Sequence, residues 1–237
     1  MKYLDLTLPT PEENLACDEA LLDQAEAGAG EEVLRFWEPL QHFVVVGYAN
    51  RAATAVNVAA CAKLGVPILR RCSGGGAVLQ GPGCLNYALV LRIDERLQGI
   101  GLTNLLIMTR HQQALARAAG RPVAVKGVAD LALGDRKFSG NSQRRRQRFL
   151  LFHGTFLLDL DVELIECCLR PPTRQPDYRR NRAHVEFVLN LHLPAASVKQ
   201  ALRESWQTDG PLDQLPTERL ASLWQEKYAR AAWNLKL

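Results

Sequence analysis

Three consecutive glycines follow two arginines in the segment RRCSGGGAVLQGPGCLNY, which runs from Arg70 to Tyr87. Glycine is costly to order, so such a cluster marks tight turns or the close approach of backbone to a ligand. Exposed amides of Gly74–Gly76, with the charges of Arg70 and Arg71, would suit the phosphate of a bound molecule. The segment matches neither GxxxxGK[ST] nor GxGxxG, the usual nucleotide-binding glycine patterns. The alternative is a glycine-rich hairpin turn beside two solvated arginines.

A lysine is the second candidate for chemistry. Lys137 stands in the segment ADLALGDRKFSGNSQ, in a stretch predicted to be a strand. Alternation along a strand would put Lys137 and Ser139 on one face and Phe138 on the other. A lysine beside a glycine can neutralise a phosphate or carboxylate, and Asp130 is placed to hold a magnesium ion or to orient the lysine. The alternative is a surface hairpin with an exposed lysine.

Polar residues interrupt a third, strongly apolar segment, RFLLFHGTFLLDL. His153, Gly154 and Thr155 in such a strand indicate a bulge or the close approach of a ligand; the alternative is a buried structural histidine. A histidine here is also compatible with acyl transfer, in which it would activate a cysteine nucleophile. Cys72 and Cys84, which flank the glycine segment, are the candidate cysteines. Small buried cysteines without a chemical role are the commoner outcome.

A basic run, Arg144–Arg146 with Arg148, follows the lysine segment. Such a run is usually a solvated hairpin tip, and it is also suited to an acidic partner protein or to pyrophosphate. Neither an aromatic platform nor a recognition-helix pattern accompanies it, so we expect no nucleic-acid partner.

The chain has 237 residues, of which 47% are hydrophobic and 23% charged, with a formal net charge of +4. This balance is typical of a globular protein and compatible with an acidic ligand. The six cysteines contain no CxxC pair, which disfavours a zinc site and a secreted disulfide framework. The sequence contains neither an apolar N-terminal segment nor an apolar stretch of about 18 residues. We therefore expect a cytoplasmic protein with reduced thiols and no membrane partner.

Hydrophobic periodicity predicts strands and helices in irregular alternation. Thr10 as N-cap, Pro11 at the first position and Glu13 form a capping box that begins the first helix, and Gly28 and Gly30 end it. Strands are expected over 2–8, 32–38, 42–48, 66–72, 85–93, 123–127, 129–134, 136–143 and 148–160, and further helices over 57–65, 104–120, 161–170, 196–206 and 217–232. The pattern predicts an α+β fold with a mostly antiparallel sheet flanked by helices. We expect one catalytic domain over residues 1–237.

The order of these motifs resembles the catalytic domain of lipoate–protein ligases, within the biotin/lipoate protein ligase family. The segments NLACDEALL, LRFWE, VVVGYAN, RRCSGGGAV, GCLNYAL, ADL, GDRKFSGNSQ, FHGTFLLDLDVELI and VLNL occur in this order between Asn14 and Leu191. The most specific are RRCSGGGAV and the pair RKFSGNSQ and HGTFLLD.

The resemblance implies an enzyme that activates lipoate with ATP and magnesium to lipoyl-AMP. The lipoyl group would then pass to a lysine of a carrier protein: the glycine-cleavage H-protein, a dehydrogenase acyltransferase subunit or another lipoate-binding protein. Lys137 would be the catalytic residue, in contact with the acyl carboxyl and the phosphate, and Asp130 a possible magnesium ligand. The lipoyl-adenylate pocket would be formed by Arg70, Ser73, Gly74, Gly75, Gly76, Ala77, Val78, Asn86, Asp130, Ser139, Gly140, His153, Gly154 and Thr155.

Two features depart from the family pattern. Gln80 and Gly81 stand where the family often has His-Asp, so contacts assigned to that pair do not transfer to this chain. Many bacterial ligases also carry a C-terminal accessory domain, whereas the tail over 195–237 has room only for short helices. Three explanations are open. A separate subunit could supply the function of the accessory domain, the protein could work without it, or the protein could catalyse only the transfer step.

Two other functions are compatible with the same resemblance. One is an ATP-independent octanoyl or lipoyl transferase of the same fold, which takes the acyl group from a carrier thioester, in some cases through a cysteine. The other is a non-catalytic family member that binds lipoyl-adenylate or a carrier.

Overall fold

The computed structural model describes residues 1–28 and 30–236. Its largest element is a seven-stranded sheet with the order β1-β2-β6-β10-β9-β8-β7. The β1–β2 pair is parallel, and every other neighbouring pair is antiparallel. The strands are β1 (Lys2–Asp5), β2 (Val33–Trp37), β6 (Cys84–Arg92), β7 (Ala124–Lys126), β8 (Asp130–Leu133), β9 (Arg136–Arg145) and β10 (Phe149–Leu157). The predicted α+β class with a mostly antiparallel sheet is confirmed.

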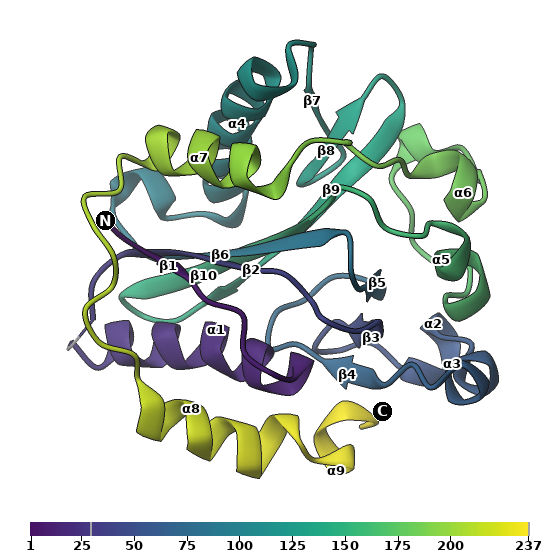
Figure 1. The fold of residues 1–237 in the computed structure, drawn as a ribbon, viewed down its shortest axis with the longest axis horizontal. Coiled ribbons are helices and arrows are strands. Elements are labelled where there is room, and N and C mark those ends of the chain that lie inside the picture. Colours follow the sequence, from purple (N-terminus) through teal and green to yellow (C-terminus); the bar gives the residue numbers. More distant parts are fainter. Residues whose placement is uncertain (29, 237) are drawn as a thin grey trace.

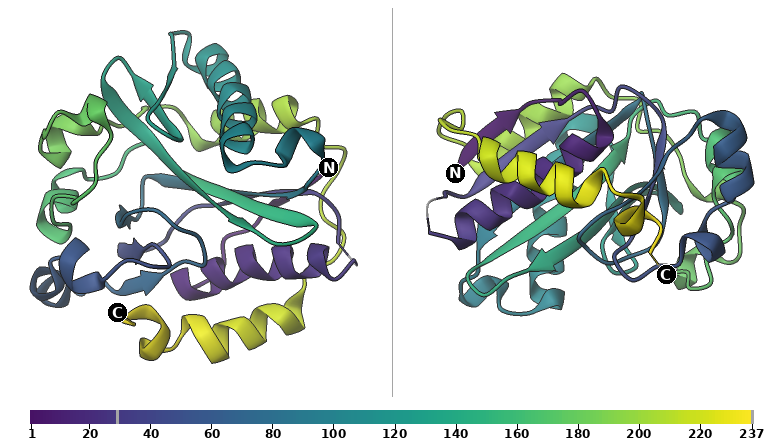
Figure 2. Two further views of the ribbon diagram at one scale, coloured as in Figure 1. Left: turned by 180° about the vertical axis from the view of Figure 1, so that it is seen from behind. Right: turned by 90° about the horizontal axis from the view of Figure 1, so that it is seen from below.

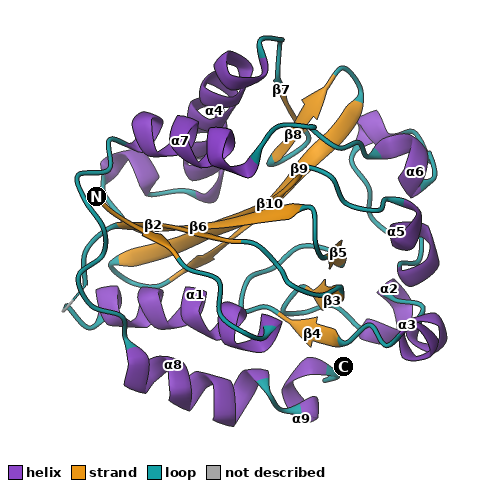
Figure 3. Ribbon diagram, viewed as in Figure 1, coloured by secondary structure: helices purple, strands orange, loops and turns teal. Residues whose placement is uncertain are grey.

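A smaller sheet of three strands, with the order β4-β3-β5, lies beside the large one (Figure 3). It consists of β3 (Phe43–Val46), β4 (Ile68–Arg70) and β5 (Val78–Gln80). The glycine loop, residues 73–77, lies between β4 and β5. β5 was not predicted, because three residues bordered by glycines are too few to show a periodicity.

Helices cover both faces of the large sheet (Figure 1). α4 (Ile100–Ala119) and α7 (Ala195–Trp206) lie on one face, and α1 (Pro11–Glu26) lies on the other, with α8 (Thr217–Leu223) alongside it (Figure 2). The short elements are α2 (Ala52–Ala55), α3 (Val58–Leu64), η1 (Glu95–Leu97), α5 (Glu163–Cys168), η2 (Asp177–Arg179), α6 (His184–Phe187), the π-helical turn η3 (Trp224–Tyr228) and α9 (Ala231–Asn234). In the described part of the chain, no helix has both the length and the apolar character that crossing a membrane requires.

The first helix begins where the capping box predicts. Glu13 N donates to the Thr10 hydroxyl (3.2 Å), and Thr10 N donates to the Glu13 carboxylate (2.9 Å). Gly28 follows the helix with a φ of +91°, a conformation that favours glycine. α4 begins four residues earlier than the predicted 104–120, because its first turn carries exposed apolar residues that do not follow the buried periodicity.

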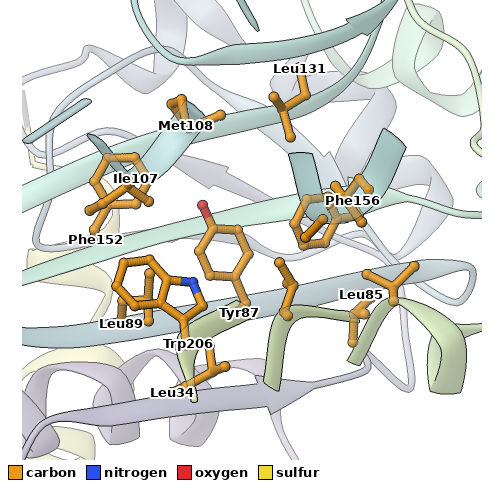
Figure 4. Close-up of a cluster of buried hydrophobic side chains, with 14 of the residues drawn as sticks. Leu34, Leu85, Tyr87, Leu89, Ile107, Met108, Leu131, Phe152, Phe156 and Trp206 are labelled. Carbon is orange, nitrogen blue, oxygen red and sulfur yellow. The ribbon is translucent and has the colours of Figure 1, made fainter. Parts of the chain in front are cut away.

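The main core lies between the large sheet and the helices α4 and α7 (Figure 4). Alternate residues of β2, β6 and β10 face this core, as expected for strands with period two. They pack against apolar side chains of the two helices. Labelled members of the cluster are Leu34, Leu85, Tyr87, Leu89, Ile107, Met108, Leu131, Phe152, Phe156 and Trp206.

A buried histidine in this core gives the fold a pH dependence. Trp206 Nε1 donates to His111 Nε2 (2.9 Å), so the imidazole is held neutral. Burial lowers the pKa of His111 from its ordinary 6.5 to about 3. The unfolded chain binds more protons than the folded one between these values, so stability is lost as the pH falls below 6.5.

We expect the free energy of unfolding to decrease by about 1 kcal/mol for each pH unit below 6.5 on account of His111. In His111→Gln, which keeps an acceptor for Trp206, this slope should be shallower. Urea unfolding of both proteins at pH 7, 6 and 5 measures the difference. Equal slopes would show that His111 is not the source.

Candidate functional site

Arg71 binds the carbonyl side of the glycine loop. Its Nε and Nη2 donate to Gly74 O (3.1 and 2.6 Å), and Nη2 also donates to Gly76 O (2.9 Å). Asn50 Nδ2 donates to Gly75 O (2.9 Å). The carbonyl oxygens of all three glycines thus accept hydrogen bonds from Arg71 or Asn50. No hydrogen bond among the described residues uses the amides of these glycines. Gly74, Gly75 and Gly76 are exposed, so their amides are available as donors to an anion.

Close packing explains two of the glycines at this place. Gly75 has a φ of +90°, and a Cβ there would lie 2.8 Å from Arg71 Nη2. A Cβ at Gly47, in the segment after β3, would overlap the carbonyl oxygen of Gly75. The costly glycines are therefore used for the approach of one backbone segment to another as well as for the exposed amides.

The loop is anchored to the large sheet through Ser73. Ser73 Oγ lies 2.5 Å from Nε2 of His153 on β10, and His153 Nδ1 lies 3.4 Å from Asp18 Oδ2 on α1. Asp18 in turn forms an ion pair with Arg35 of β2. All four side chains are buried. This chain explains why His153 interrupts an apolar strand.

The strand register places further candidate residues in one row. Asp130 pairs with Gly140, Gly140 with Thr155, Thr155 with Asn86, and Asn86 with Trp37. Directly paired residues project to the same face of a sheet. This is the face on which His153 binds the glycine loop, because His153 lies two residues from Thr155 on the same strand.

Lys137 lies across Gly140 on this face. Its Nζ is 2.7 Å from Asp130 Oδ1 and 2.7 Å from the position that a Cβ at Gly140 would occupy. Tyr178, in η2, donates its hydroxyl to the other carboxylate oxygen of Asp130 (2.8 Å). Asp130 thus orients Lys137. Tyr178 was not predicted, because it lies in a segment without periodicity.

The prediction that Lys137 and Ser139 share a face is wrong. The β8–β9 register shifts between Leu131 and Ala132, so Phe138 is an extra residue in the ladder. Phe138 is in the core beneath α4, and the buried Ser139 lies within 3.4 Å of Asn141 Oδ1 on that same side. Lys137 therefore lies on the opposite face, and Ser139 does not reach the loop.

Arg70 was expected to line the pocket, and the structure places it elsewhere. It is buried, and each nitrogen of its guanidinium donates to backbone carbonyls. The acceptors are the carbonyl oxygens of Gly47, Tyr48, Asn50, Trp233 and Lys236. With its donors used in this way, Arg70 joins the C-terminal segment to the loop after β3.

Gln80 closes a buried ring of polar side chains. Its Nε2 donates to Thr155 Oγ1 (2.7 Å), its Oε1 accepts from Asn86 Nδ2 (3.0 Å), and Thr155 donates to Asn86. Asn86 and Thr155 are thus bonded to each other and to the residue that departs from the family pattern. Their positions beneath the site are set by Gln80.

The remaining predicted residues shape the backbone. Ala77 and Val78 pack against apolar clusters at the start of β5. Gly154 pairs with Asn141, and a Cβ there would overlap the Asn141 amide. Neither Gly154 nor these two apolar residues offers a polar side chain to a ligand.

The residues of the basic run have different partners, so the run is not a uniformly solvated hairpin tip. Arg144 lies with its Cζ 5.7 Å from the ring centroid of Tyr48, and its buried Nε has no hydrogen-bond partner among the described residues. Arg145 donates to Leu97 O (2.6 Å), and Arg146 donates to Asp23 (3.0 Å). Arg144 lies near the glycine loop, two residues beyond Ser142, whose Oγ donates to Gly74 O (2.9 Å).

The cysteines near the loop are poor nucleophiles. Burial raises the pKa of Cys72 to about 12, and burial raises that of Cys84 to about 12 as well. A thiolate is therefore scarce at either residue near neutral pH. The histidine of the site, His153, is bonded to Ser73 and Asp18 instead of a thiol.

The predicted magnesium ligand is Asp130, and the described residues offer no larger metal-binding cluster. They contain no group of three His, Cys, Asp or Glu side chains that would hold a metal ion. Asp130 supplies a single carboxylate, of which Oδ1 pairs with Lys137 and Oδ2 accepts a hydrogen bond from Tyr178. Magnesium is usually held by one or two carboxylates together with the phosphates of a substrate. Asp130 can therefore contribute one carboxylate to a magnesium ion that substrate phosphates also hold.

Comparison with known proteins identifies relatives of this chain. A protein of Aeropyrum pernix assigned to lipoate-protein ligase A is 33% identical over 172 residues, which are 71% of this chain and 61% of the relative. An octanoyltransferase LipM of Carboxydothermus hydrogenoformans is 31% identical over 68% of this chain and 66% of the relative. The lipoate-protein ligase A subunit 1 of Thermoplasma acidophilum is 26% identical over 94% of this chain and 92% of the relative. The chain thus spans about two thirds or less of the first two relatives.

Solved structures share the fold over almost the whole chain. A T. acidophilum protein with bound lipoic acid has a TM-score of 0.84 at 23% identity and covers 99% of this chain and 98% of that chain. A lipoate-protein ligase A bound with ATP has a TM-score of 0.83 at 23% identity, with 99% of both chains covered. A bipartite lipoate protein ligase, studied with its E2 lipoyl domain from T. acidophilum, has a TM-score of 0.83 at 23% identity, covering 99% and 95%.

The family model described as lipoyl protein ligase A/B catalytic domain matches residues 10–208, which include the glycine loop, Lys137 and His153. The chain therefore belongs to the lipoyl protein ligase A/B catalytic domain family.

Proposed function

We propose that this protein is an ATP-dependent lipoate–protein ligase. In the first step, a lipoate carboxylate oxygen would attack the α-phosphorus of ATP, forming lipoyl-AMP as pyrophosphate leaves. In the second, a carrier lysine amine would attack the acyl carbon and release AMP. The observation that supports this reaction is the set of free amides at Gly74–Gly76, on the same face of the sheet as Lys137.

The geometry suits a reaction between two anions. Ser142 donates a hydrogen bond to Gly74 of the loop. Gly140, over which Lys137 lies, is two residues before Ser142 on the same strand. Residues at this spacing are about 7 Å apart, so one mixed anhydride can contact both the amides and the ammonium group. Fixed donors and a cation at that place would neutralise the carboxylate and the phosphate as they approach. Lys137 would then polarise the acyl carbonyl during transfer.

The named relatives support the same reaction and its partners. Family structures carry lipoic acid in one case and ATP in another. A third was studied with an E2 lipoyl domain and is one part of a bipartite ligase. We therefore propose a lipoyl-carrier protein as the acceptor and a separate accessory subunit, with residues 1–237 as one catalytic domain. A cytoplasmic location belongs to the proposal, because ATP is available there and the described cysteines are free thiols.

The test is a ligation assay with the purified protein, lipoate, ATP with magnesium, and an apo-carrier. The expected result is a carrier heavier by one lipoyl group and release of pyrophosphate, both dependent on ATP. The assay includes the E2 lipoyl domain and the H-protein as carriers, each with and without an accessory subunit. Lipoylation in none of these combinations would contradict the proposal.

The second candidate is an ATP-independent octanoyltransferase, favoured by the relatives that carry this name. Where such an enzyme uses a cysteine, the candidates here are Cys72 and Cys84, and their raised pKa values oppose that role.

Cysteine substitution separates the two candidates. We expect the Cys72→Ala and Cys84→Ala variants to retain ligation within about threefold of the unmodified protein, because neither thiol is ionised near pH 7. Initial rates with ATP and lipoate, and with an octanoyl thioester donor, measure this. Octanoyl transfer that needs no ATP and disappears in either variant would establish the cysteine mechanism instead.

A further inference from the structure

A lysine in the C-terminal segment lies in an aromatic cage beside the glycine loop. Lys236 Nζ is 3.9 Å from the ring centroid of Tyr48 and 3.9 Å from that of Trp233. No carboxylate of the described residues forms an ion pair with it. Aromatic faces hold a cation in place without supplying a counter-charge. Lys236 is thus a positioned charge that no carboxylate of residues 1–28 and 30–236 neutralises.

A second such charge lies near the same ring. Arg144 Cζ is 5.7 Å from the Tyr48 centroid, so the two cations are less than about 10 Å apart. Arg144 has no ion pair among the described residues, and its buried Nε lacks a hydrogen-bond partner. Two like charges this close repel each other unless an anion lies between them. A nearby lysine differs in this respect: Lys227 also faces Trp233 (4.1 Å), but it pairs with the carboxylate of Glu19 (2.6 Å).

Hydrogen bonds to the backbone tie Tyr48 and Lys236 to the region of the glycine loop. Tyr48 N donates to Ser73 O (2.8 Å), which places the aromatic residue directly beside the loop. Arg70 donates to Tyr48 O (3.1 Å) and to Lys236 O (2.5 Å), so one buried guanidinium fixes the C-terminal segment against this region. Figure 1 shows α9, which precedes Lys236, next to β4, from which the loop starts.

We propose that Lys236 and Arg144, together with the exposed amides of Gly74–Gly76, form a subsite for a phosphate group of the nucleotide. A phosphate about 4 Å from each cation would fit between two charges less than about 10 Å apart. Phosphate oxyanions also accept hydrogen bonds from backbone amides. This inference rests on the proposed use of ATP and extends the site to the C-terminal segment, outside residues 10–208 that match the family.

A purely mechanical role for Lys236 is the competing explanation. In that case the side chain would only hold the tail against Tyr48, and its loss would loosen the whole site. Lys236→Met tests this, because methionine keeps most of the apolar stem and removes the charge. Lys236→Arg restores the charge. Lys227→Met is the matched control, since it removes the other lysine that faces Trp233.

The experiment measures the dissociation constants of ATP, AMP and lipoate by calorimetry, with the melting temperature of each variant. In Lys236→Met we expect the dissociation constant of ATP to rise about tenfold, as for loss of one charge-assisted contact. If the subsite takes the α-phosphate, the dissociation constant of AMP should rise by the same factor. Lipoate binding should stay unchanged, Lys236→Arg should recover at least half of the loss, and Lys227→Met should bind ATP normally. Unchanged ATP binding in Lys236→Met, or equal losses for ATP and lipoate, would overturn the subsite. An unmodified protein that binds no ATP would instead overturn the proposed function, and this inference with it.

Discussion

Lys137→Ala is expected to lower lipoylation of the carrier by about 100- to 1,000-fold, the usual effect of removing one group that stabilises developing charge. The ammonium group is held over Gly140 by Asp130, on the side of the sheet that carries the glycine loop. Both adenylation and transfer need a cation there, so both half-reactions should slow. Rapid-quench measurement of lipoyl-AMP formation, and separately of transfer from added lipoyl-AMP, gives the two rates.

The stability of the Lys137→Ala variant should hardly change. Its ion pair with Asp130 is partly exposed, and such pairs contribute about 0–1 kcal/mol. Lys126→Ala is the matched control, because Lys126 pairs with Asp135 at the same end of the sheet and lies in β7. It should ligate normally. A Lys137→Ala protein that ligates as fast as the control would rule out a catalytic role for Lys137. A variant that still binds the carrier without turnover would agree with that role.

Arg35→Met is expected to reduce the free energy of unfolding by about 3–5 kcal/mol, the cost of leaving a buried carboxylate without its partner. Arg35 is fully buried between α1 and the sheet, where it pairs with Asp18 and donates to Asn14 Oδ1 (2.6 Å). Urea unfolding followed by circular dichroism measures the loss. Because Asp18 also contacts His153, the variant should release the anchor of Ser73 and weaken ligation as well.

A double variant separates the lost charge from the lost volume. Arg35→Met with Asp18→Leu removes both charges, and buried ion pairs replaced by apolar residues often recover the stability. We expect the double variant to be at least about 1–2 kcal/mol more stable than Arg35→Met alone. A double variant that is less stable than the single one would show that packing of Asp18, and not an unpaired charge, causes the loss.

Local sequence rules predicted the framework of the fold well. The capping box at Thr10 and Glu13 is present, and the apolar runs of β2, β6 and β10 form the centre of the sheet. These features depend on residues close together in the chain, where capping and period-two patterns apply directly. The expected family and fold are confirmed on the same motifs.

The features that were not predicted depend on contacts between residues far apart in the sequence. Arg70 and Arg71 are adjacent and look equivalent, yet Arg70 binds the C-terminal segment and Arg71 binds the loop, because successive strand residues project in opposite directions. An extra residue at Phe138 changed the face of Lys137, and a bulge has no signature in this strand sequence. Tyr178 reaches Asp130, and Lys236 reaches Tyr48, from segments without periodicity, so only the folded chain brings these residues together.

The most direct test of the central claim is the mass of the small molecule that the protein retains after incubation with lipoate and ATP. The account predicts lipoyl-AMP, bound to the unmodified protein, absent when ATP is omitted, and strongly reduced in Lys137→Ala. A protein that forms no adenylate, and that modifies its carrier only from an acyl thioester, would contradict it.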